Sequence, residues 1–290
     1  MKRLIVTADD FGAAVEVNEA VEAAHRGGVL TAASLMVGAP AAKDAVARAL
    51  ALPTLRVGLH LVLVEGRPVL PPAAVSRLVD AGGLFRCDMA ALGAAIAFSA
   101  RARRQLAAEI GAQFEAFCAT GLALDHCNAH KHFHLHPVVG ALLAEIGGRF
   151  GLRAARVPHE PADVLRQIEP QTRLLAGAAL APFSFQLRRT LRANGVLAPD
   201  RSFGIRWSGH MTKMRLSALI GRLPDGLSEI YLHPATGRYA GSAPGYRYRD
   251  ELDALMAPEV AAVCRDASLE LGGFTDFLTF RAEIRHEAMS

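Results

Sequence analysis

The amino-acid sequence predicts an α/β protein with a mostly parallel sheet wrapped by helices, either open or closed into a barrel. Short apolar runs alternate along the chain with longer segments whose apolar residues recur at helical spacing. Polar residues that can do chemistry follow the ends of several of these runs, and ligand sites in such folds lie at the carboxyl ends of the strands. The 290 residues are 51% hydrophobic and 21% charged, so the chain can form a large core.

The first part of the chain shows this alternation most clearly. The β-branched run Leu4–Thr7 predicts a buried strand. A helix is predicted over 15–26, because its apolar residues are spaced three and four apart and Gly27-Gly28 follows them as a stop signal. The next predicted elements are a strand at 34–37, a helix at 39–52, which ends before a proline, and a strand at 56–62.

The same alternation continues to the C-terminus. Residues 103–120 carry an apolar stripe at helical spacing and end at Gly121. A strand is predicted to begin at Leu122–Asp125 and to run into a histidine-rich segment. The remaining predicted elements are a helix at 137–150 and strands at 152–157, 229–233 and 271–275.

Two adjacent carboxylates, Asp9 and Asp10, follow the first predicted strand. Aspartate is favoured at helix N-caps, so the pair could have only a structural role. Alternatively, one carboxylate binds a cation while its neighbour takes a proton from water. His60 stands near the end of the third predicted strand. A lone histidine in an apolar strand is more often a core residue, but this strand end should face Asp10.

The segment from His126 to His136 contains five of the eleven histidines of the chain. Neutral imidazole is a common ligand for transition metals and titrates near neutral pH. The even-numbered positions share one face if the segment is extended, whereas residues four apart share a face if it is helical. A catalytic metal site usually takes three protein ligands and leaves one position for water. At least two of the five histidines therefore have another role, and a solvated histidine-rich loop is the alternative.

An arginine and a further histidine follow later strand ends. Arg156 is either surface charge or the partner of a bidentate ion pair that holds Asp9 ionised. His233 has either a capping or core role, or serves as a general acid for a leaving amine. The polar residues at or just after strand ends together indicate a metal-dependent hydrolytic site: Asp9, Asp10, His60, Asn128, His130 and His233.

Composition and charge narrow the function classes. The net charge is +4, and the basic residues are scattered without an aromatic-interleaved stretch, so nucleic acid is not an expected partner. Four cysteines without CxxC spacing indicate reduced thiols. No run reaches the roughly 20 apolar residues that cross a bilayer, and the N-terminus lacks a signal-peptide core. We expect a cytoplasmic protein, with peripheral contact to the inner membrane as an option.

One apolar segment, Leu174–Phe185, has arginines on both sides. Such a segment is usually a buried helix. The alternative is an apolar lid or interfacial surface with a basic fringe. A lipid, a membrane surface and a second copy of the chain in a homodimer would each fit it.

These motifs together resemble those of the YdjC-like carbohydrate deacetylases, in the same order and over nearly the full length of the chain. Within that family the chain is most similar to the hopanoid-biosynthesis-associated (HpnK) branch, because of residues 62–68, 128–137 and 229–236. The segments that carry the family resemblance are Thr7–Gly12, Gly58–Leu61, His130–His134 and Leu232–Ala235.

The resemblance implies a fold and a reaction. The expected fold is a deformed (β/α) barrel of the polysaccharide-deacetylase type, with parallel strands and outer helices. Residues 1–290 would form a single domain, with residues about 160–225 as an apolar insertion or lid. The expected reaction is hydrolysis of the acetamide of an N-acetylglucosamine group, on a hopanoid glycolipid in the closer branch, with release of acetate. A soluble chitooligosaccharide deacetylase and, more remotely, a non-enzymatic metal- or lipid-binding protein are the alternatives.

The resemblance also implies roles for individual residues. One divalent metal is expected, and two histidines with a carboxylate favour Zn²⁺, with Mg²⁺ or another divalent ion as an alternative. Many relatives have Asp-Ser where this chain has Asn128-Ala129, so the charge around the metal differs, and Asp125 is the candidate to compensate. The expected metal ligands are Asp10, His60 and His130, the base is Asp9, the acid is His233, the residue that orients the base is Arg156, and Phe11, Asn128, His132 and His134 are the expected substrate contacts.

Overall fold

Strands and helices alternate along most of the chain in the computed structural model, which describes residues 1–171 and 175–278. The first half contains β1 (Lys2–Phe11), α1 (Val15–Gly27), β2 (Ala32–Leu35), α2 (Ala42–Leu50), β3 (Arg56–Leu61), η1 (Pro72–Val75), α3 (Met89–Phe98), α4 (Ala100–Cys118), β4 (Cys127–Ala129), η2 (His130–Leu135) and α5 (Pro137–Arg149). The second half contains α6 (Ala162–Ile168), α7 (Leu175–Ala193), β5 (Arg201–Phe203), α8 (Lys213–Gly221), β6 (Gly226–Leu232), α9 (Tyr248–Met256), α10 (Pro258–Asp266), β7 (Glu270–Leu271) and η3 (Thr275–Phe277).

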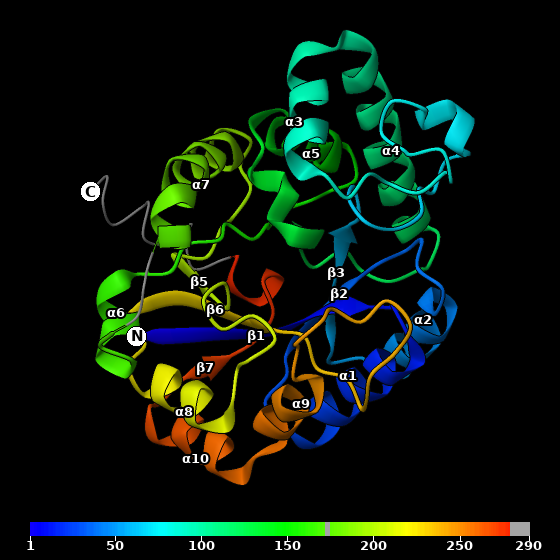
Figure 1. The fold of residues 1–290 in the computed structure, drawn as a ribbon. Coiled ribbons are helices and arrows are strands. Elements are labelled where there is room, and N and C mark those ends of the chain that lie inside the picture. The colour runs from blue at the N-terminus through cyan, green and yellow to red at the C-terminus, as the bar shows by residue number, and fades with distance from the viewer. Residues whose placement is uncertain (172–174, 279–290) are drawn as a thin grey trace.

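The strands form one parallel sheet in the order β4-β3-β2-β1-β6-β5, with β7 paired to the start of β1. Single bridges continue the sheet beyond β4, from Cys127 to Ala155 and from Ala154 to Leu197. A further bridge joins His159 to Ser202 in β5. The sheet therefore curls towards closure, as a deformed (β/α) barrel with helices outside (Figure 1).

The central strand and its first helix follow directly from the sequence pattern. β1 lies between β2 and β6 in the sheet, and all its residues from Arg3 to Phe11 are buried. In α1 the residues spaced three and four apart, Val17, Ala20, Val21 and Ala24, are buried. The predicted strand and helix therefore both form, although β1 extends through both aspartates.

Three predicted strands are wrong, shifted or much shortened. None of residues 122–125 belongs to a strand, because β4 begins only at Cys127. Residues 152–157 form only the isolated bridges described above. Of residues 271–275, only Leu271 belongs to a strand. Here side chains replace the strand ladder: the carboxylate of Asp125 accepts from the backbone N–H groups of Phe274 and Thr275, at 3.1 and 2.9 Å. Side-chain acceptors of this kind compete with sheet pairing for the backbone N–H groups.

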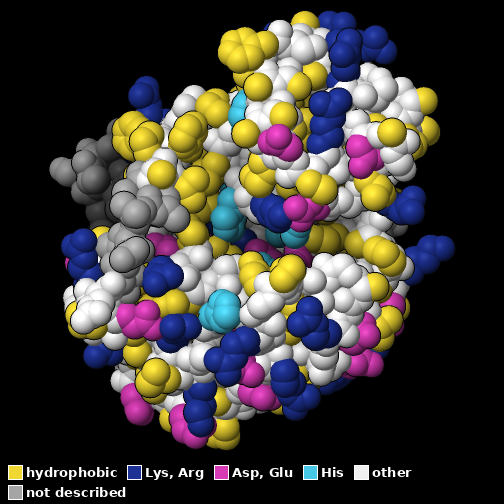
Figure 2. All heavy atoms as spheres, viewed as in Figure 1, with side chains coloured by type: hydrophobic (Ala, Val, Ile, Leu, Met, Phe, Trp, Pro, Cys, Tyr) yellow, Lys and Arg dark blue, Asp and Glu magenta, His cyan; other side chains and the backbone are white. Residues whose placement is uncertain are grey.

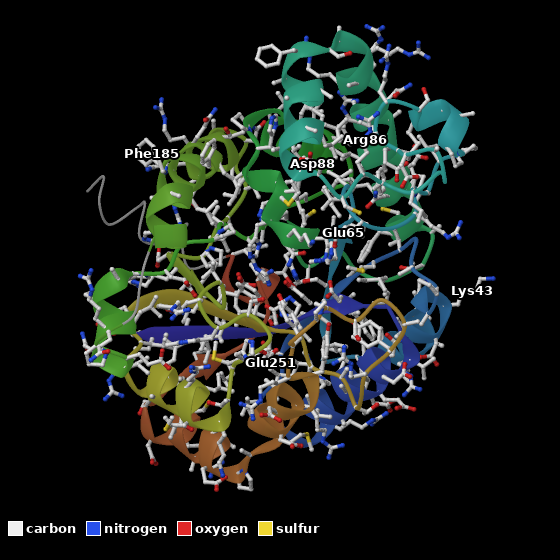
Figure 3. All side chains as sticks on the ribbon, in the orientation of Figure 1. Lys43, Glu65, Arg86, Asp88, Phe185 and Glu251 are labelled. Carbon is white, nitrogen blue, oxygen red and sulfur yellow. The ribbon has the colours of Figure 1, made fainter. Side chains whose placement is uncertain are left out.

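Residues 160–225 contain α6, α7, β5 and α8, and β5 is a strand of the main sheet. Within the apolar segment 174–185, Leu174 lies outside the described residues, as do the side chains of 175–178. Phe183 and Phe185 are 45% and 65% exposed, and Figure 3 shows Phe185 on the outer side of α7. Among the described residues, no helix combines the length and the hydropathy needed to cross a membrane.

The helices gather in two groups on either side of the strand ends. In Figure 1, α3, α4, α5 and α7 lie above the sheet, and α1, α8, α9 and α10 lie below it. Between these groups the surface is hollowed, and histidine and acidic side chains are visible inside the hollow (Figure 2). This cleft is where the polar residues at the strand ends meet.

Candidate active site

Four strands bring the polar residues to one edge of the sheet. β1 ends with Asp9, Asp10 and Phe11, and His60 pairs in register with Asn128 of the neighbouring strand. The backbone of Asp10 has a φ of 62°, a left-handed conformation that aspartate tolerates better than most residues. On the other side of β1, β6 ends at Leu232, directly before His233.

Asp10, His60 and His130 form a compact donor set. One ligand atom from each lies within 4.8 Å of the other two. Oδ1 of Asp10 is 3.3 Å from Nε2 of His60 and 3.2 Å from Nδ1 of His130. Nε2 of His60 is buried and makes no hydrogen bond among the described residues. An orphaned imidazole nitrogen that points at a carboxylate and a second imidazole fits a divalent metal site, and this donor set suits Zn²⁺.

The second carboxylate, Asp9, is bound by a buried arginine. Nη1 and Nη2 of Arg156 contact the two carboxylate oxygens of Asp9 at 2.5 and 3.1 Å. The same guanidinium contacts Oε1 of Glu229 at 2.9 Å through Nε and at 2.6 Å through Nη2. Burial raises the pKa of Asp9, but Arg156, His60 and His233 together lower it by more, and the pKa lies well below its usual range. Asp9 is therefore an anion with a fixed orientation.

His233 faces the same site from the end of β6. Its backbone N–H donates to Oε2 of Glu251 at 2.5 Å, which fixes the loop, and Figure 3 shows Glu251 on α9 beneath the cleft. Nδ1 of His233 is buried without a hydrogen-bond partner among the described residues. Burial lowers the pKa of this imidazole, against the opposing charges of Asp10 and Asp9. The ring is therefore neutral at rest near pH 7.

The four expected substrate contacts lie in different surroundings. His132 lines the cavity, and its Nε2 is 2.7 Å from the hydroxyl of Tyr231. His134 is fully buried, and its Nε2 donates to the carbonyl oxygen of Arg156 at 3.1 Å. Phe11 has no exposed surface and packs in the core. Asn128 is also buried, where it joins His60 to Asp9. Of the four, only His132 is among the residues that line the cavity.

The cavity over these residues has a volume of about 430 Å³. Its walls include all four tyrosines of the chain, Tyr231, Tyr239, Tyr246 and Tyr248. The rings of Tyr239 and Tyr246 are 5.3 and 5.5 Å from that of Tyr248. These tyrosines were not among the site residues expected from the sequence, although all four fall within residues 231–248.

Glu65, which is labelled in Figure 3, lines the cavity together with Lys131 and forms an ion pair with it. Both residues have positive φ values, 49° and 52°. Lys131 directly precedes the cavity-lining His132, so this pair holds the turn that follows His130.

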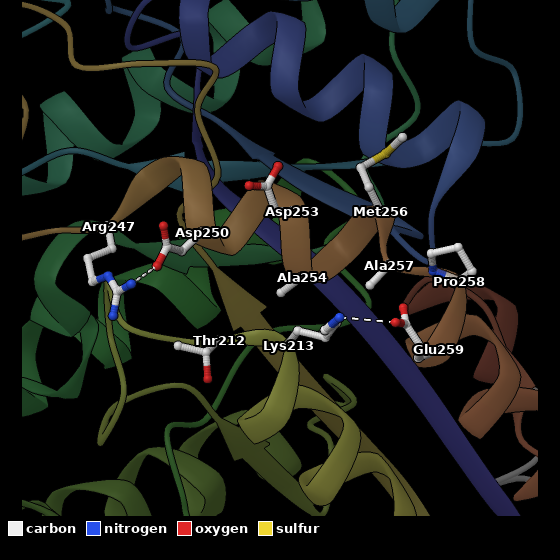
Figure 4. Close-up of a pocket in the computed structure, with 10 residues that line it drawn as sticks. All are labelled: Thr212, Lys213, Arg247, Asp250, Asp253, Ala254, Met256, Ala257, Pro258 and Glu259. Atoms are coloured by element: carbon white, nitrogen blue, oxygen red, sulfur yellow. Dashed lines mark hydrogen bonds and ion pairs between the residues drawn. The ribbon is translucent and has the colours of Figure 1, made fainter.

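A larger cavity, of about 630 Å³, lies among α8, α9 and α10 (Figure 4). Its two cationic side chains already have partners: Lys213 is 3.0 Å from Glu259, and Arg247 pairs with Asp250. No histidine is among the residues that line it. Size alone therefore does not identify the functional site, and the chemistry lies in the smaller cavity.

The fold and the site define this protein as a (β/α) barrel with a carboxylate–histidine centre at the carboxyl ends of its strands. The chain belongs to the YdjC-like protein family, whose model matches residues 3–266. A crystal structure from Enterococcus faecalis, of a protein assigned to cellobiose-phosphate cleavage, superposes with a TM-score of 0.73 over 95% of this chain and 98% of that one. The two are 20% identical, so this likeness confirms the barrel fold alone.

Several relatives are named carbohydrate deacetylase. The one from Geobacillus stearothermophilus is 31% identical over 278 residues, which cover 94% of this chain and 97% of the relative. The one from Homo sapiens is 30% identical over 306 residues, 94% of this chain and 90% of the relative. For the one from Brevibacillus brevis the match is 38% identical but spans about half of each chain, 51% and 56%.

Proposed function

We propose that this protein is a metal-dependent N-deacetylase that hydrolyses the acetamide of an N-acetylglucosamine group and releases acetate. The observation that carries the proposal is the side-by-side placement of two carboxylates with different partners. Asp10 faces two imidazoles, whereas Asp9 is held by Arg156. The names of the relatives, carbohydrate deacetylases, agree with this division of labour.

Asp10, His60 and His130 would hold the metal ion. A divalent cation in this position would act as a Lewis acid, which polarises an amide carbonyl and lowers the pKa of water. Zn²⁺ suits two imidazoles and one carboxylate, with Mg²⁺ or another divalent ion as an alternative.

Asp9 is the proposed base. Arg156 keeps the carboxylate ionised and fixes its plane, so Asp9 is ready to accept a proton from the attacking water. The proposed proton acceptor Asp9 and the proposed metal ligand Asp10 are adjacent residues of β1. Such positioning reduces the entropy cost of bringing the reacting groups together.

His233 is the proposed acid. Water adds its oxygen to the acetyl carbon, the C–N bond breaks, and the sugar nitrogen needs a proton to leave as an amine. The ring of His233 lines the cavity, and its buried Nδ1 has no hydrogen-bond partner in the described part of the chain. Burial lowers the pKa of this ring, so it is neutral at rest. The proton that Asp9 takes from water passes to His233, which donates it to the leaving nitrogen, so both residues return to their starting states.

The cavity walls support a sugar as substrate. Aromatic rings offer apolar faces to the C–H groups of a pyranose, and their hydroxyls can hydrogen-bond. Tyr239, Tyr246 and Tyr248 form such a wall beside the donor set. We propose further that the sugar is linked to a hopanoid lipid, because α7 presents exposed phenylalanines that an apolar tail could contact.

Acetate release from a small substrate panel tests both the metal dependence and the lipid linkage of the substrate. The panel contains N-acetylglucosaminyl hopanoid and chitobiose, each with and without a chelator. We expect acetate only without chelator, and more from the glycolipid. Activity that survives complete metal removal would refute the metal dependence, and a preference for chitobiose would refute the lipid linkage.

A matched pair of variants tests the lipid contact. Phe185→Ser in α7 should lower activity on the glycolipid and leave activity on chitobiose unchanged. Phe98→Ser at the end of α3, where the ring is 89% exposed, should change neither. Equal effects of the two substitutions on the glycolipid would remove α7 from the proposal.

A further inference from the structure

A continuous line of buried polar groups runs behind the proposed metal ligands. It begins at Asp125, whose Oδ2 is 2.8 Å from Nδ1 of His126. Nε2 of His126 is 2.9 Å from the hydroxyl oxygen of Ser34. Ser34 in turn accepts from Nδ2 of Asn128 at 3.0 Å, and Oδ1 of Asn128 is 2.6 Å from Nδ1 of His60. All five residues are buried, and they come from three strands and the segment before β4.

The direction of the hydrogen bonds near His60 is fixed by Asp9. The carboxylate of Asp9 only accepts, and Nδ2 of Asn128 donates to its Oδ1 at 2.9 Å. The amide of Asn128 therefore turns its oxygen to His60, and a carbonyl oxygen requires a donor there. Nδ1 of His60 must carry the hydrogen, so Nε2 of the neutral ring has a free lone pair. That lone pair is on the nitrogen that faces Asp10.

The direction is fixed independently at the other end. The carboxylate of Asp125 accepts from Nδ1 of His126, so Nε2 of the neutral ring accepts from the hydroxyl of Ser34. Ser34 has then used its only hydrogen and must accept from Asn128. Both ends impose the same orientation on the amide of Asn128, and every donor in the line has an acceptor.

We propose that Ser34, His126 and Asp125 are positioning residues that lock the amide of Asn128 and thereby hold His60 in the tautomer that binds the metal. This inference rests on the proposed function, because it takes His60 as a ligand. Partners behind a metal-binding histidine commonly set its tautomer and orientation, and their loss lowers metal affinity about 10–100-fold. Here three residues, Asn128, Ser34 and His126, connect His60 to the carboxylate of Asp125.

The packing around His126 holds its ring in one position. The His126 ring stacks on Phe274, with centroids 4.1 Å apart and planes 19° apart. A Cβ atom at Gly58 would lie 2.5 Å from Nδ1 of His126, so the glycine makes room for the ring. Asp125 also accepts from the backbone N–H groups of Phe274 and Thr275. The C-terminal part of the barrel is thus hydrogen-bonded to the same line of groups.

The test is the tautomeric state of His60 in wild-type, metal-free protein, measured by ¹⁵N–¹H correlation through the imidazole ring. At a pH of about 9 an ordinary imidazole is neutral, and we expect both His60 and His126 with the hydrogen on Nδ1. A hydrogen on Nε2 of His60 would overturn the proposal. This readout needs no substrate, so a failure of the proposed deacetylation would be seen separately, as missing acetate release.

A matched pair of serine variants adds a second readout. Ser34→Ala breaks the line, and we expect Zn²⁺ affinity to fall about 10–100-fold, with a mixture of His60 tautomers. Ser228→Ala is the control, because Ser228 is a buried serine of β6 whose hydroxyl has no hydrogen-bond partner among the described residues. Equal Zn²⁺ affinity of the two folded variants would contradict the proposal.

Discussion

Replacing Arg156 by lysine tests how the proposed base is held. Arg156 is fully buried and makes four N–H···O contacts to two buried carboxylates, Asp9 and Glu229. Lysine keeps the charge, but its single ammonium cannot bind both carboxylates with the same geometry. Hydrogen bonds to charged groups contribute about 1.5–3 kcal/mol each. Loss of two of them predicts a decrease of about 3–6 kcal/mol in the free energy of unfolding, close to the cost of breaking a buried ion pair.

Denaturant unfolding of the metal-free protein measures this decrease for Arg156→Lys. The control is Arg149→Lys, because Arg149 pairs with Glu145 at the surface, where both side chains are more than 60% exposed. Exposed pairs contribute about 0–1 kcal/mol, so this variant should unfold like the wild type. A loss below about 1 kcal/mol for Arg156→Lys, or equal losses for the two variants, would refute the reasoning.

Three further substitutions probe the site. Asp9→Asn should lower turnover about 10²–10⁴-fold with the bound metal retained, so an active variant in kinetic assays would reject Asp9 as the base. His130→Ala should lose the metal in elemental analysis, whereas the exposed His210→Ala control should keep it. Burial raises the pKa of the Glu251 carboxyl group from 4.5 to about 7. The stability that this shift contributes to the fold is fully present below about pH 4.5 and is lost as the pH rises through about 7. Unfolding experiments should therefore show Glu251→Gln gaining about 3 kcal/mol relative to the wild type between about pH 4.5 and 8, and a constant difference would contradict the shift.

The sequence predicted the barrel well where one residue pattern decides the structure. The periodicity of α1 and the β-branched start of β1 are local properties, and both elements form. The helix has nearly the predicted bounds, whereas β1 runs from Lys2 to Phe11, beyond the predicted Leu4–Thr7. The strand predicted at 271–275 is mostly absent because its backbone donors find the side chain of Asp125, about 150 positions earlier in the chain. No local pattern shows such a partner.

The arrangement of the candidate site could likewise be predicted only in part. Asp10, His60 and His130 are brought together as the strand-end argument predicted, because parallel strands place their carboxyl ends at one edge. Whether they bind the metal is still a prediction. Phe11 lies in the core, although regular alternation would place it on the same face as Asp9, which lines the cavity. The pairing of β1 shifts register between Ala8 and Phe11, and Asp10 has a left-handed backbone. The sequence does not show this irregularity.

His126 and Ser34 could not be assigned from the sequence. Their contact depends on the packing of β2 against the segment before β4, 92 positions apart in the chain. The neighbouring Asn128 was visible as a departure from its relatives, but the three hydrogen-bond partners that give it a role became visible only in the folded structure.

The most direct test of the central claim is a metal titration of chelator-treated protein in the presence of an N-acetylglucosaminyl substrate, with acetate and free amine measured together. We predict that both products appear in equal amounts and that activity saturates at one metal ion per chain. Metal-loaded, folded protein that releases no acetate from any N-acetylated sugar would contradict the claim, and the donor set would then serve metal binding alone.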